Sequence, residues 1–201
     1  MHEILVTAFG PFSGFPENPS EAILAAWSPD LPPGWRARKF VLPVSWADAA
    51  PRLLAALREE TRFVLCLGVA AGRDRITLER LARNRNDTAL ADTGGAKPPG
   101  EAVVPGGPDT LRSSLPADDL ADALQAAGIP AEVSDDAGAY LCNHVSYALF
   151  HHLARHPRAC LAGFIHVPPA DRLAPAQGAR ALRTVVNQLL ADLGDGKVHP
   201  A

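Results

Sequence analysis

The chain of 201 residues is 47% hydrophobic and 20% charged, a composition typical of a globular protein, and its length suits one domain. Its 19 basic and 22 acidic side chains give a net charge of -3 without a basic stripe, which excludes nucleic acid as an expected partner. No stretch is long and apolar enough to predict a transmembrane helix, and the start MHEILVTAFG does not resemble a signal peptide, so no membrane partner is expected.

In the first third of the chain, strands and helices are expected to alternate. Short apolar runs that end at Gly or Pro predict buried strands, and apolar residues at helical spacing predict helices. Asn18, followed by Pro19, is expected to cap the first helix. The expected strands are 3–9, 38–44 and 62–68, and the expected helices are 19–27 and 46–60.

A Gly- and Pro-rich segment, residues 84–115, interrupts this alternation. A long segment without predicted structure is usually functional when it lies inside a compact domain. We hypothesise that it is an active-site loop that closes over a bound ligand. In that case the ligand should protect the segment from proteolysis.

Alternation resumes after this loop, with expected helices at 117–128, 140–155 and 176–194 and expected strands at 129–134 and 159–167. The order of elements predicts the α/β class, in which helices cover both faces of an open, twisted, mostly parallel sheet. We expect a single domain, 1–201, with the architecture of an α/β/α sandwich of the phosphorylase/hydrolase-like type.

Four groups of candidate functional residues follow predicted strands. Ligand sites in open α/β sheets lie beyond the carboxyl ends of the strands, so we expect these groups to meet at one edge of the sheet. They are Phe9, Phe12 and Asn18 after the first strand, Gly68 to Gly72 and then Glu79 after the third, Cys142 after the strand at 129–134, and His166 near the end of the strand at 159–167.

Cys142 is a candidate nucleophile because it is expected in the first turn of a helix. Unpaired backbone N–H groups and the positive end of the helix dipole favour a thiolate there, and a nearby protonated histidine would favour it further. The same N–H groups can stabilise an oxyanion. The alternative is a buried cysteine that only fills space, since free cysteine is among the most buried residue types.

Cys142, His166 and Glu79 together fit nucleophilic acyl transfer. In that interpretation Cys142 attacks, His166 is the general base, and Glu79 orients the imidazole. Each has a structural alternative: His166 could be a neutral histidine bonded to backbone, and Glu79 could be a helix residue paired with Arg80 and Arg83.

The remaining cysteines and histidines are weaker candidates. An odd number of cysteines without CxxC spacing argues against disulfides and a cysteine zinc site, and favours a reducing, cytoplasmic location. Cys66 and Cys160 are expected in the core. Four histidines are expected to form a partly solvated helix face without a clear acidic third metal ligand, so no metal is expected: His144, His151, His152 and His156.

Four segments carry a resemblance to a known family: LVTAFGPFSGFPENPS near the start, LGVAAGRDRITLERLARN in the middle, DAGAYLCNHVSYALFHHL and GFIHVPP. They resemble the signature segments of the pyroglutamyl peptidase I family, the pyrrolidone-carboxylate peptidases, which are cysteine peptidases. The segments occur in the order of the family, and the similarity spans nearly the whole chain. The family's fold is an open α/β/α sandwich.

The resemblance implies an enzyme that removes an N-terminal pyroglutamyl residue from peptides through a thioester, with no metal or organic cofactor. Carried over by motif, the nucleophile falls on Cys142, the general base on His166 and the acidic member on Glu79. It also implies a homo-oligomer, a dimer or a tetramer, for which the helix at 176–193 offers a candidate surface.

Pyroglutamate is a small, flat lactam without a charged amine, so its pocket should have apolar walls and a few amide partners. We expect Phe9 and Phe12 to enclose the ring and Asn18 to bond to it or to brace their loop. Backbone groups of Gly68, Val69 and Ala70 are expected to meet the lactam N–H and C=O.

The chain departs from the family pattern at two positions. Val69 stands where many members have Gln, and Ala89 stands where many have an Arg that helps to polarise the site. Arg83 or Arg85 could replace that cation. Because loss of a charge-stabilising group costs on the order of 10²-fold in rate, we expect low or altered activity.

Two other functions remain open. One is a cysteine hydrolase of another small amide, which the changes at Val69 and Ala89 would cause. The other is a non-catalytic α/β protein that binds small molecules through its glycine loops, with an unreactive Cys142 and affinity for anions.

Overall fold

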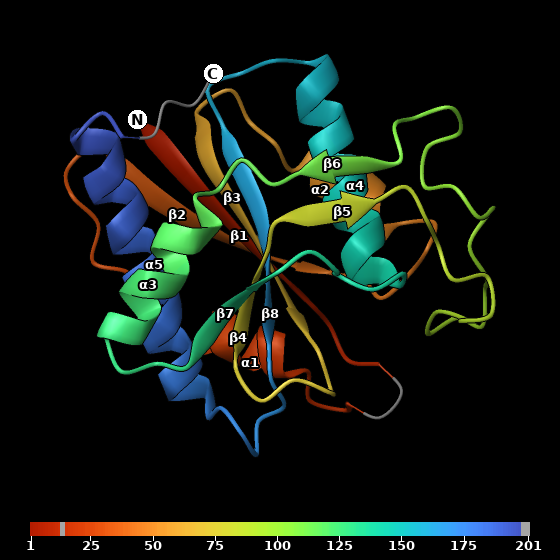
Figure 1. The fold of residues 1–201 in the computed structure, drawn as a ribbon, viewed down its shortest axis with the longest axis horizontal. Coiled ribbons are helices and arrows are strands. Elements are labelled where there is room, and N and C mark those ends of the chain that lie inside the picture. The colour runs from red at the N-terminus through yellow and green to blue at the C-terminus, as the bar shows by residue number, and fades with distance from the viewer. Residues whose placement is uncertain (13–14, 198–201) are drawn as a thin grey trace.

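The computed structural model describes residues 1–12 and 15–197, and it consists of a central sheet with helices on both faces (Figure 1). The main sheet contains β1 (His2–Phe9), β2 (Trp35–Leu42), β3 (Thr61–Val69), β4 (Ile76–Glu79), β7 (Ala131–Ser134) and β8 (Leu161–Val167). A separate pair is formed by β5 (Leu81–Arg83) and β6 (Thr110–Arg112). The helices are α1 (Pro19–Ala26), α2 (Ala49–Ala55), α3 (Ala117–Ala126), α4 (Leu141–Arg155) and α5 (Pro175–Gly194).

The main sheet has the strand order β2-β1-β3-β8-β4-β7. The first four of these strands are parallel, whereas β4 runs antiparallel to β8 and parallel to β7. The link from β3 to β4 is short, and parallel strands need a long crossover, so the chain turns back instead. The mostly parallel open sheet predicted from the sequence is confirmed, with an antiparallel part that the sequence did not indicate.

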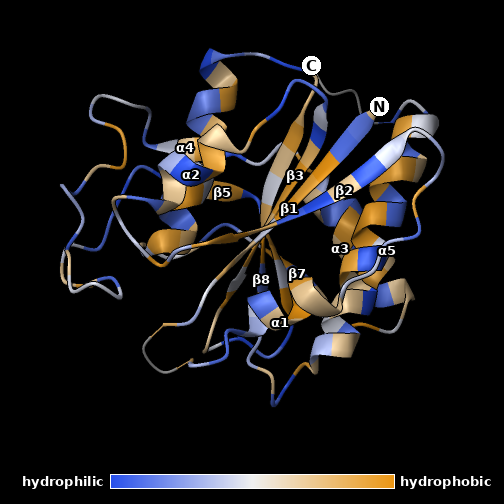
Figure 2. Cartoon of the chain, turned by 180° about the vertical axis from the view of Figure 1, so that it is seen from behind, coloured by the Kyte–Doolittle hydropathy of each residue, from blue (hydrophilic) through white to orange (hydrophobic). Residues whose placement is uncertain are grey.

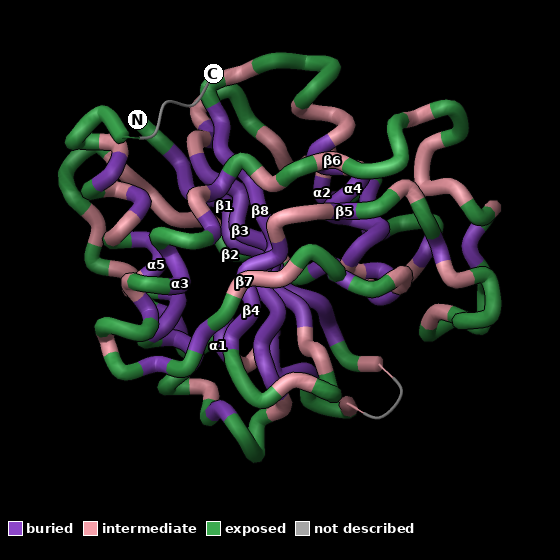
Figure 3. Tube along the Cα trace, viewed as in Figure 1, coloured by how far each residue is buried: buried purple, intermediate pink, exposed green. Residues whose placement is uncertain are grey.

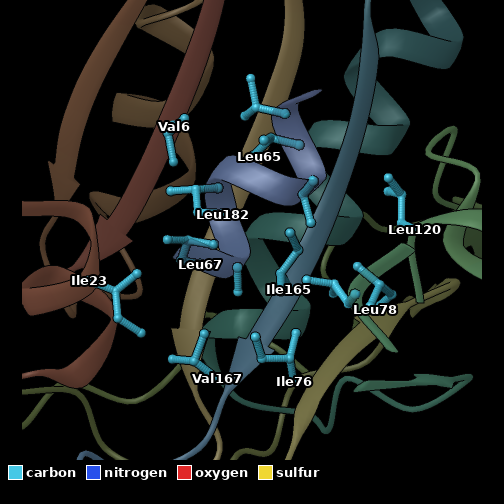
Figure 4. Packing of buried hydrophobic residues seen from close by; sticks show 14 of the residues in the cluster. Val6, Ile23, Leu65, Leu67, Ile76, Leu78, Leu120, Ile165, Val167 and Leu182 are labelled. Atoms are coloured by element: carbon cyan, nitrogen blue, oxygen red, sulfur yellow. The ribbon is translucent and has the colours of Figure 1, made fainter. Parts of the chain in front are cut away.

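Two hydrophobic clusters hold the layers together, one on each face of the sheet. Helices α1, α3 and α5 cover one face, and α2 and α4 cover the other (Figures 1 and 2). The middle strands β1, β3 and β8 are buried along most of their length (Figure 3), as their continuous apolar runs predict. The first cluster, shown in Figure 4, includes Leu182 of α5 beside Val6, Leu65 and Ile165 of the sheet.

The apolar side of α5 is covered within the chain itself. Leu182, Val185 and Leu189 belong to the core, and Gly178 lets α1 approach so closely that a Cβ there would lie 2.3 Å from Ile23. The prediction that this helix offers an apolar surface for a partner subunit is therefore wrong.

None of the helices in the described part of the chain is long and apolar enough to cross a membrane.

The segment from 84 to 109 contains no helix or strand, but many hydrogen bonds fix its course. Asn84 bonds to the backbone of Val104 with both its amide N and its amide O. Asn86 donates to the carbonyls of Gly100 and Ala102. The side-chain amides of Asn84 and Asn86 thus replace the regular backbone pairing that a Gly- and Pro-rich sequence cannot form.

His144 anchors this segment to α4, so its predicted place on a solvated face is wrong. The side chain is buried, and Nδ1 lies 2.9 Å from Oδ1 of Asn86. Burial lowers the pKa of His144 from 6.5 to about 4. The ring is therefore neutral near pH 7 and donates its Nδ1–H to the amide oxygen.

The free energy of unfolding is expected to fall by up to about 3 kcal/mol between pH 6.5 and pH 4, because unfolded His144 binds a proton in this range and folded His144 does not. Urea unfolding of the wild type and of His144→Gln at several pH values measures the effect. The Gln variant should lose this part of the pH dependence, whereas His156→Gln, at an exposed position, should keep it. Equal slopes for wild type and His144→Gln would contradict the assignment.

Candidate active site

Glu79 and His166 form a hydrogen-bonded pair across two neighbouring strands. Nδ1 of His166 lies 2.7 Å from Oε1 of Glu79, and both side chains are almost completely buried. The carboxylate accepts the Nδ1–H, which leaves Nε2 of the imidazole as a proton acceptor. Glu79 lies in β4, so the alternative of a helix residue paired with Arg80 and Arg83 is wrong.

Cys142 lies in the first turn of α4, directly over β3. Its Sγ is 2.8 Å from the position that a Cβ would occupy on Gly68, and Gly68 is paired with His166 in the neighbouring strand. The absence of a side chain at Gly68 therefore leaves the space that the thiol occupies, and Cys142 and His166 line the same pocket.

The side chain of Asn143 fixes the beginning of α4 to the backbone of Arg83 and Arg85. Its Oδ1 accepts from the backbone N–H of Arg83, and its Nδ2 donates to the carbonyls of Arg83 and Arg85. Within the described residues no side chain caps this helix start, where Tyr140 occupies the N-cap position. Its first backbone N–H groups thus remain available for an oxyanion.

The thiol of Cys142 does not have the low pKa that its position predicts. Burial raises the pKa to about 12, and the charge of Glu79 adds to the increase, while the helix backbone acts in the opposite direction. Because desolvation outweighs the helix start, the free protein carries a thiol that must lose its proton to a base. Cys66 and Cys160 are buried in the core as predicted.

Cys142 and His166 open into one mainly apolar pocket of about 230 Å³. It contains Phe9, Phe12, Asn18 and Val69, as expected, and no acidic side chain of the described residues lines it. Ala71, from the predicted stretch Gly68 to Gly72, also lines it. The further lining residues, which the sequence interpretation missed, are Phe15, Val44, Ala137, Gly138, Ala139, Tyr140 and Leu141.

Comparison with known proteins identifies relatives of the whole chain. The family model described as pyroglutamyl peptidase matches residues 2–183. A pyrrolidone-carboxylate peptidase of Oceanobacillus iheyensis is 41% identical over 175 residues, 87% of each chain, and one of Streptomyces coelicolor is 37% identical over all of this chain and 94% of its own. The chain belongs to the pyroglutamyl peptidase family.

Solved structures of this family have the same fold. The pyrrolidone carboxyl peptidase from Thermococcus litoralis superposes with a TM-score of 0.88 at 30% identity, covering 98% of this chain and 96% of the other. The pyroglutamyl peptidase I of Bacillus amyloliquefaciens gives 0.83 at 31% identity, covering 92% and 95%. The resemblance noted in the sequence and its implied fold are confirmed.

Aromatic residues of the loop after β1 form one wall of the pocket. Phe12 stacks on Phe15 with ring centroids 5.1 Å apart, and their backbones bond to each other in both directions. Asn18 braces this loop: Nδ2 donates to the carbonyl of Gly10 and Oδ1 accepts from the backbone N–H of Ser20. The capping role and the bracing role of Asn18 thus coexist. The sequence interpretation did not name Phe15, although a second Phe three residues after Phe12 is a feature that could have indicated it.

Gly68 and Ala70 were predicted to contact the substrate, but neither residue lines the pocket. Gly68 lies beneath Cys142, and the N–H of Ala70 donates to the carbonyl of Val167. The sheet has already used this N–H group, so it cannot also meet a substrate. Val69 and Ala71 are the residues of this stretch that reach the pocket.

Arg73 is the cation beside Glu79, and the sequence interpretation missed it. Its Nη1 lies 3.0 Å from Oε1 of Glu79. Arg83 pairs instead with Asp136, and Arg85 is exposed and contacts Asn143 through its backbone carbonyl. Neither Arg83 nor Arg85 therefore replaces the cation that is missing at Ala89, as the sequence had suggested.

Among the described side chains, no group of three or more His, Cys, Asp or Glu is placed to hold a metal ion.

Proposed function

We propose that this chain removes N-terminal pyroglutamyl residues from peptides, with Cys142 as nucleophile, His166 as general base and Glu79 as the residue that orients the imidazole. The observation that carries the proposal is the 2.7 Å bond between His166 and Glu79 at the wall of the pocket that also contains Cys142. Family membership supports the same reaction.

The first step begins from a neutral thiol. Cys142, whose pKa is about 12, transfers its proton to Nε2 of His166 as its sulfur attacks the pyroglutamyl carbonyl. A C–S bond forms, and the carbonyl oxygen takes up negative charge near the first N–H groups of α4. Glu79 stabilises the imidazolium that results.

The second half of the reaction reverses the proton transfers. His166 donates its proton to the leaving amine, the C–N bond breaks, and the thioester remains on Cys142. His166 then takes a proton from water as the water oxygen attacks the thioester carbonyl; the C–S bond breaks, pyroglutamate leaves, and His166 returns the proton to the sulfur of Cys142. The residues present suffice for every step.

The pocket accounts for selectivity toward the lactam. Its walls are apolar, and the described lining contains no carboxylate that could pair with an ammonium group. A prolyl residue has nearly the same ring but carries a charged amine, whose burial without a partner is costly.

A fluorogenic pyroglutamyl amide is therefore expected to be hydrolysed at least about 10³-fold faster, in kcat/KM, than the matching prolyl amide. Parallel assays of the two amides with the wild type measure the ratio. Hydrolysis of other small amides, with the pyroglutamyl amide left intact, would instead support a hydrolase of changed specificity, for which Val69 and Ala89 are the candidate causes.

The segment 84–115 belongs to the proposal as an active-site loop. The N–H of Asp87 donates to the carbonyl of Ala139, and the hydroxyl of Tyr140 donates to the carbonyl of Ala91. Ala139 and Tyr140 line the pocket, so these contacts support a role of the segment in holding that wall in place, although none of the segment's own residues, all of them described, lines the pocket.

Location and assembly are also proposed. The free thiols at Cys66, Cys142 and Cys160 support a reducing, cytoplasmic location. Assembly as a homodimer or homotetramer is supported by the family resemblance, and the contact surface must lie outside the covered face of α5.

A further inference from the structure

Arg73 connects two parts of the active site from the turn between β3 and β4. Its Nη1 lies 3.0 Å from Oε1 of Glu79, the same oxygen that accepts the hydrogen bond from His166. Its Nη2 donates to the carbonyl of Asp136 over 2.8 Å and to Oγ of Ser134 over 3.2 Å. Arg73 thus binds both the acidic member of the triad and the segment that leads into α4.

The charge of Arg73 compensates the buried carboxylate of Glu79, which the hydrogen bond to His166 alone does not do. The side chain of Glu79 is 1% exposed, and its Oε2 has no hydrogen-bond partner among the described residues. A buried carboxylate is costly without a counter-charge, and a neutral imidazole supplies none. A guanidinium keeps its positive charge at every pH at which a protein is folded.

We propose that Arg73 is a positioning residue of the catalytic site: it compensates the charge of Glu79, orients its carboxylate toward His166, and fixes the segment before Cys142. This inference rests on the triad proposed above. Arg73 touches no reacting atom in this assignment and acts through Glu79 and through the chain at Asp136.

Loss of the guanidinium changes the proton equilibrium of the site in a defined direction. The charged or titratable groups near His166 are Glu79 on β4, Cys142 on α4 and, through Glu79, Arg73. Without Arg73 the full charge of Glu79 acts on the imidazole and favours its protonated form. A protonated His166 cannot accept the proton of Cys142, so activity should disappear at a higher pH on the acid side.

The test compares Arg73→Met, which removes the charge, with Arg73→Gln, which keeps a donor, and Arg73→Lys, which keeps the charge. Arg75→Met is the matched control, because Arg75 lies in the same turn but pairs with exposed Asp74. For Arg73→Met we expect kcat to fall by about 10- to 100-fold with little change in KM. The acid limb of kcat/KM should move to higher pH.

Partial recovery by Lys, none by Gln, and wild-type behaviour of Arg75→Met complete the expected result. Two results would overturn the proposal. The first is a wild-type kcat in Arg73→Met with the acid limb of its pH profile unmoved. The second is a loss of activity in Arg73→Met that leaves the acid limb in place and that is no smaller in Arg73→Lys. If Arg73→Met does not fold, as thermal unfolding will show, Arg73→Lys against Arg73→Gln decides by the same limb.

A readout without substrate separates this inference from the proposed function. The rate at which iodoacetamide alkylates Cys142 at a fixed, mildly alkaline pH, above the acid limb, depends on the ionisation of the thiol; it should fall in Arg73→Met and stay unchanged in Arg75→Met. A wild type that leaves the pyroglutamyl amide intact contradicts the proposed function, whereas the alkylation rate still tests Arg73. An active wild type together with an unchanged alkylation rate in Arg73→Met contradicts the role of Arg73 alone.

Discussion

Replacing Cys142 by alanine is expected to lower kcat/KM for a pyroglutamyl amide by about 10⁴-fold or more, because a lost nucleophile leaves only binding and oxyanion stabilisation. The substitution should not disturb the fold, since Cys142 is only half-buried and the contacts of Asn143 hold the helix start in place. Hydrolysis of the fluorogenic amide, with unfolding curves recorded in parallel, measures both effects.

The two other cysteines provide the control. Cys66 and Cys160 lie in the core and do not line the pocket, so Cys66→Ala and Cys160→Ala should lose some stability and little activity. Iodoacetamide should inactivate the wild type by modifying Cys142. Turnover that persists in Cys142→Ala would show that another group carries the chemistry.

Cys142 and His166, the residues proposed as nucleophile and base, could be singled out from the sequence because their local patterns survive in the fold. Cys142 follows a Gly-containing segment and lies in the first turn of a long helix, and His166 is the next-to-last residue of a buried apolar strand that two prolines follow. Alternating apolar runs likewise indicate the buried strands β1, β3 and β8, whose burial the structure confirms. These signals are local, and local patterns are what a sequence displays directly.

The route by which these residues meet could not be predicted. We expected Glu79 in the segment after β3 and Cys142 after a strand parallel to β1, but Glu79 lies in the additional strand β4, and both β4 and β7 run antiparallel to β8. Strand β4 has only four residues, among them a threonine and a glutamate, so no apolar run marks it. Its direction depends on pairing with a strand more than 80 residues later in the chain, and no local pattern encodes that partner.

Arg73 and His144 were missed for a related reason. Each lies in a stretch rich in similar residues, and only its tertiary partner distinguishes it from them. Arg73 differs from Arg75 by its contact with Glu79, and His144 differs from His156 by its contact with Asn86. Whether a charged or titratable side chain is solvated or paired in the interior is decided by the fold.

Gly68→Ala is expected to reduce kcat/KM by about 10²-fold although Gly68 does not line the pocket. A Cβ at this position would lie 2.7 Å from Cζ of Phe164 and 2.8 Å from Sγ of Cys142, too close for either contact to persist. Phe164 is 1% exposed and enclosed by the core, whereas Cys142 borders the open pocket, so the sulfur has more room to move.

A displaced sulfur loses its alignment with Nε2 of His166, and a shift of about 1 Å from reactive geometry is enough for a loss of this size. Gly72→Ala is the matched control, since a Cβ there meets no atom within 4 Å and the residue is exposed. The rate of alkylation of Cys142 by iodoacetamide, measured beside kcat/KM, should also change in Gly68→Ala. Normal activity in that variant would mean that Phe164 yields instead, and then the cost should appear as about 1–3 kcal/mol of lost stability.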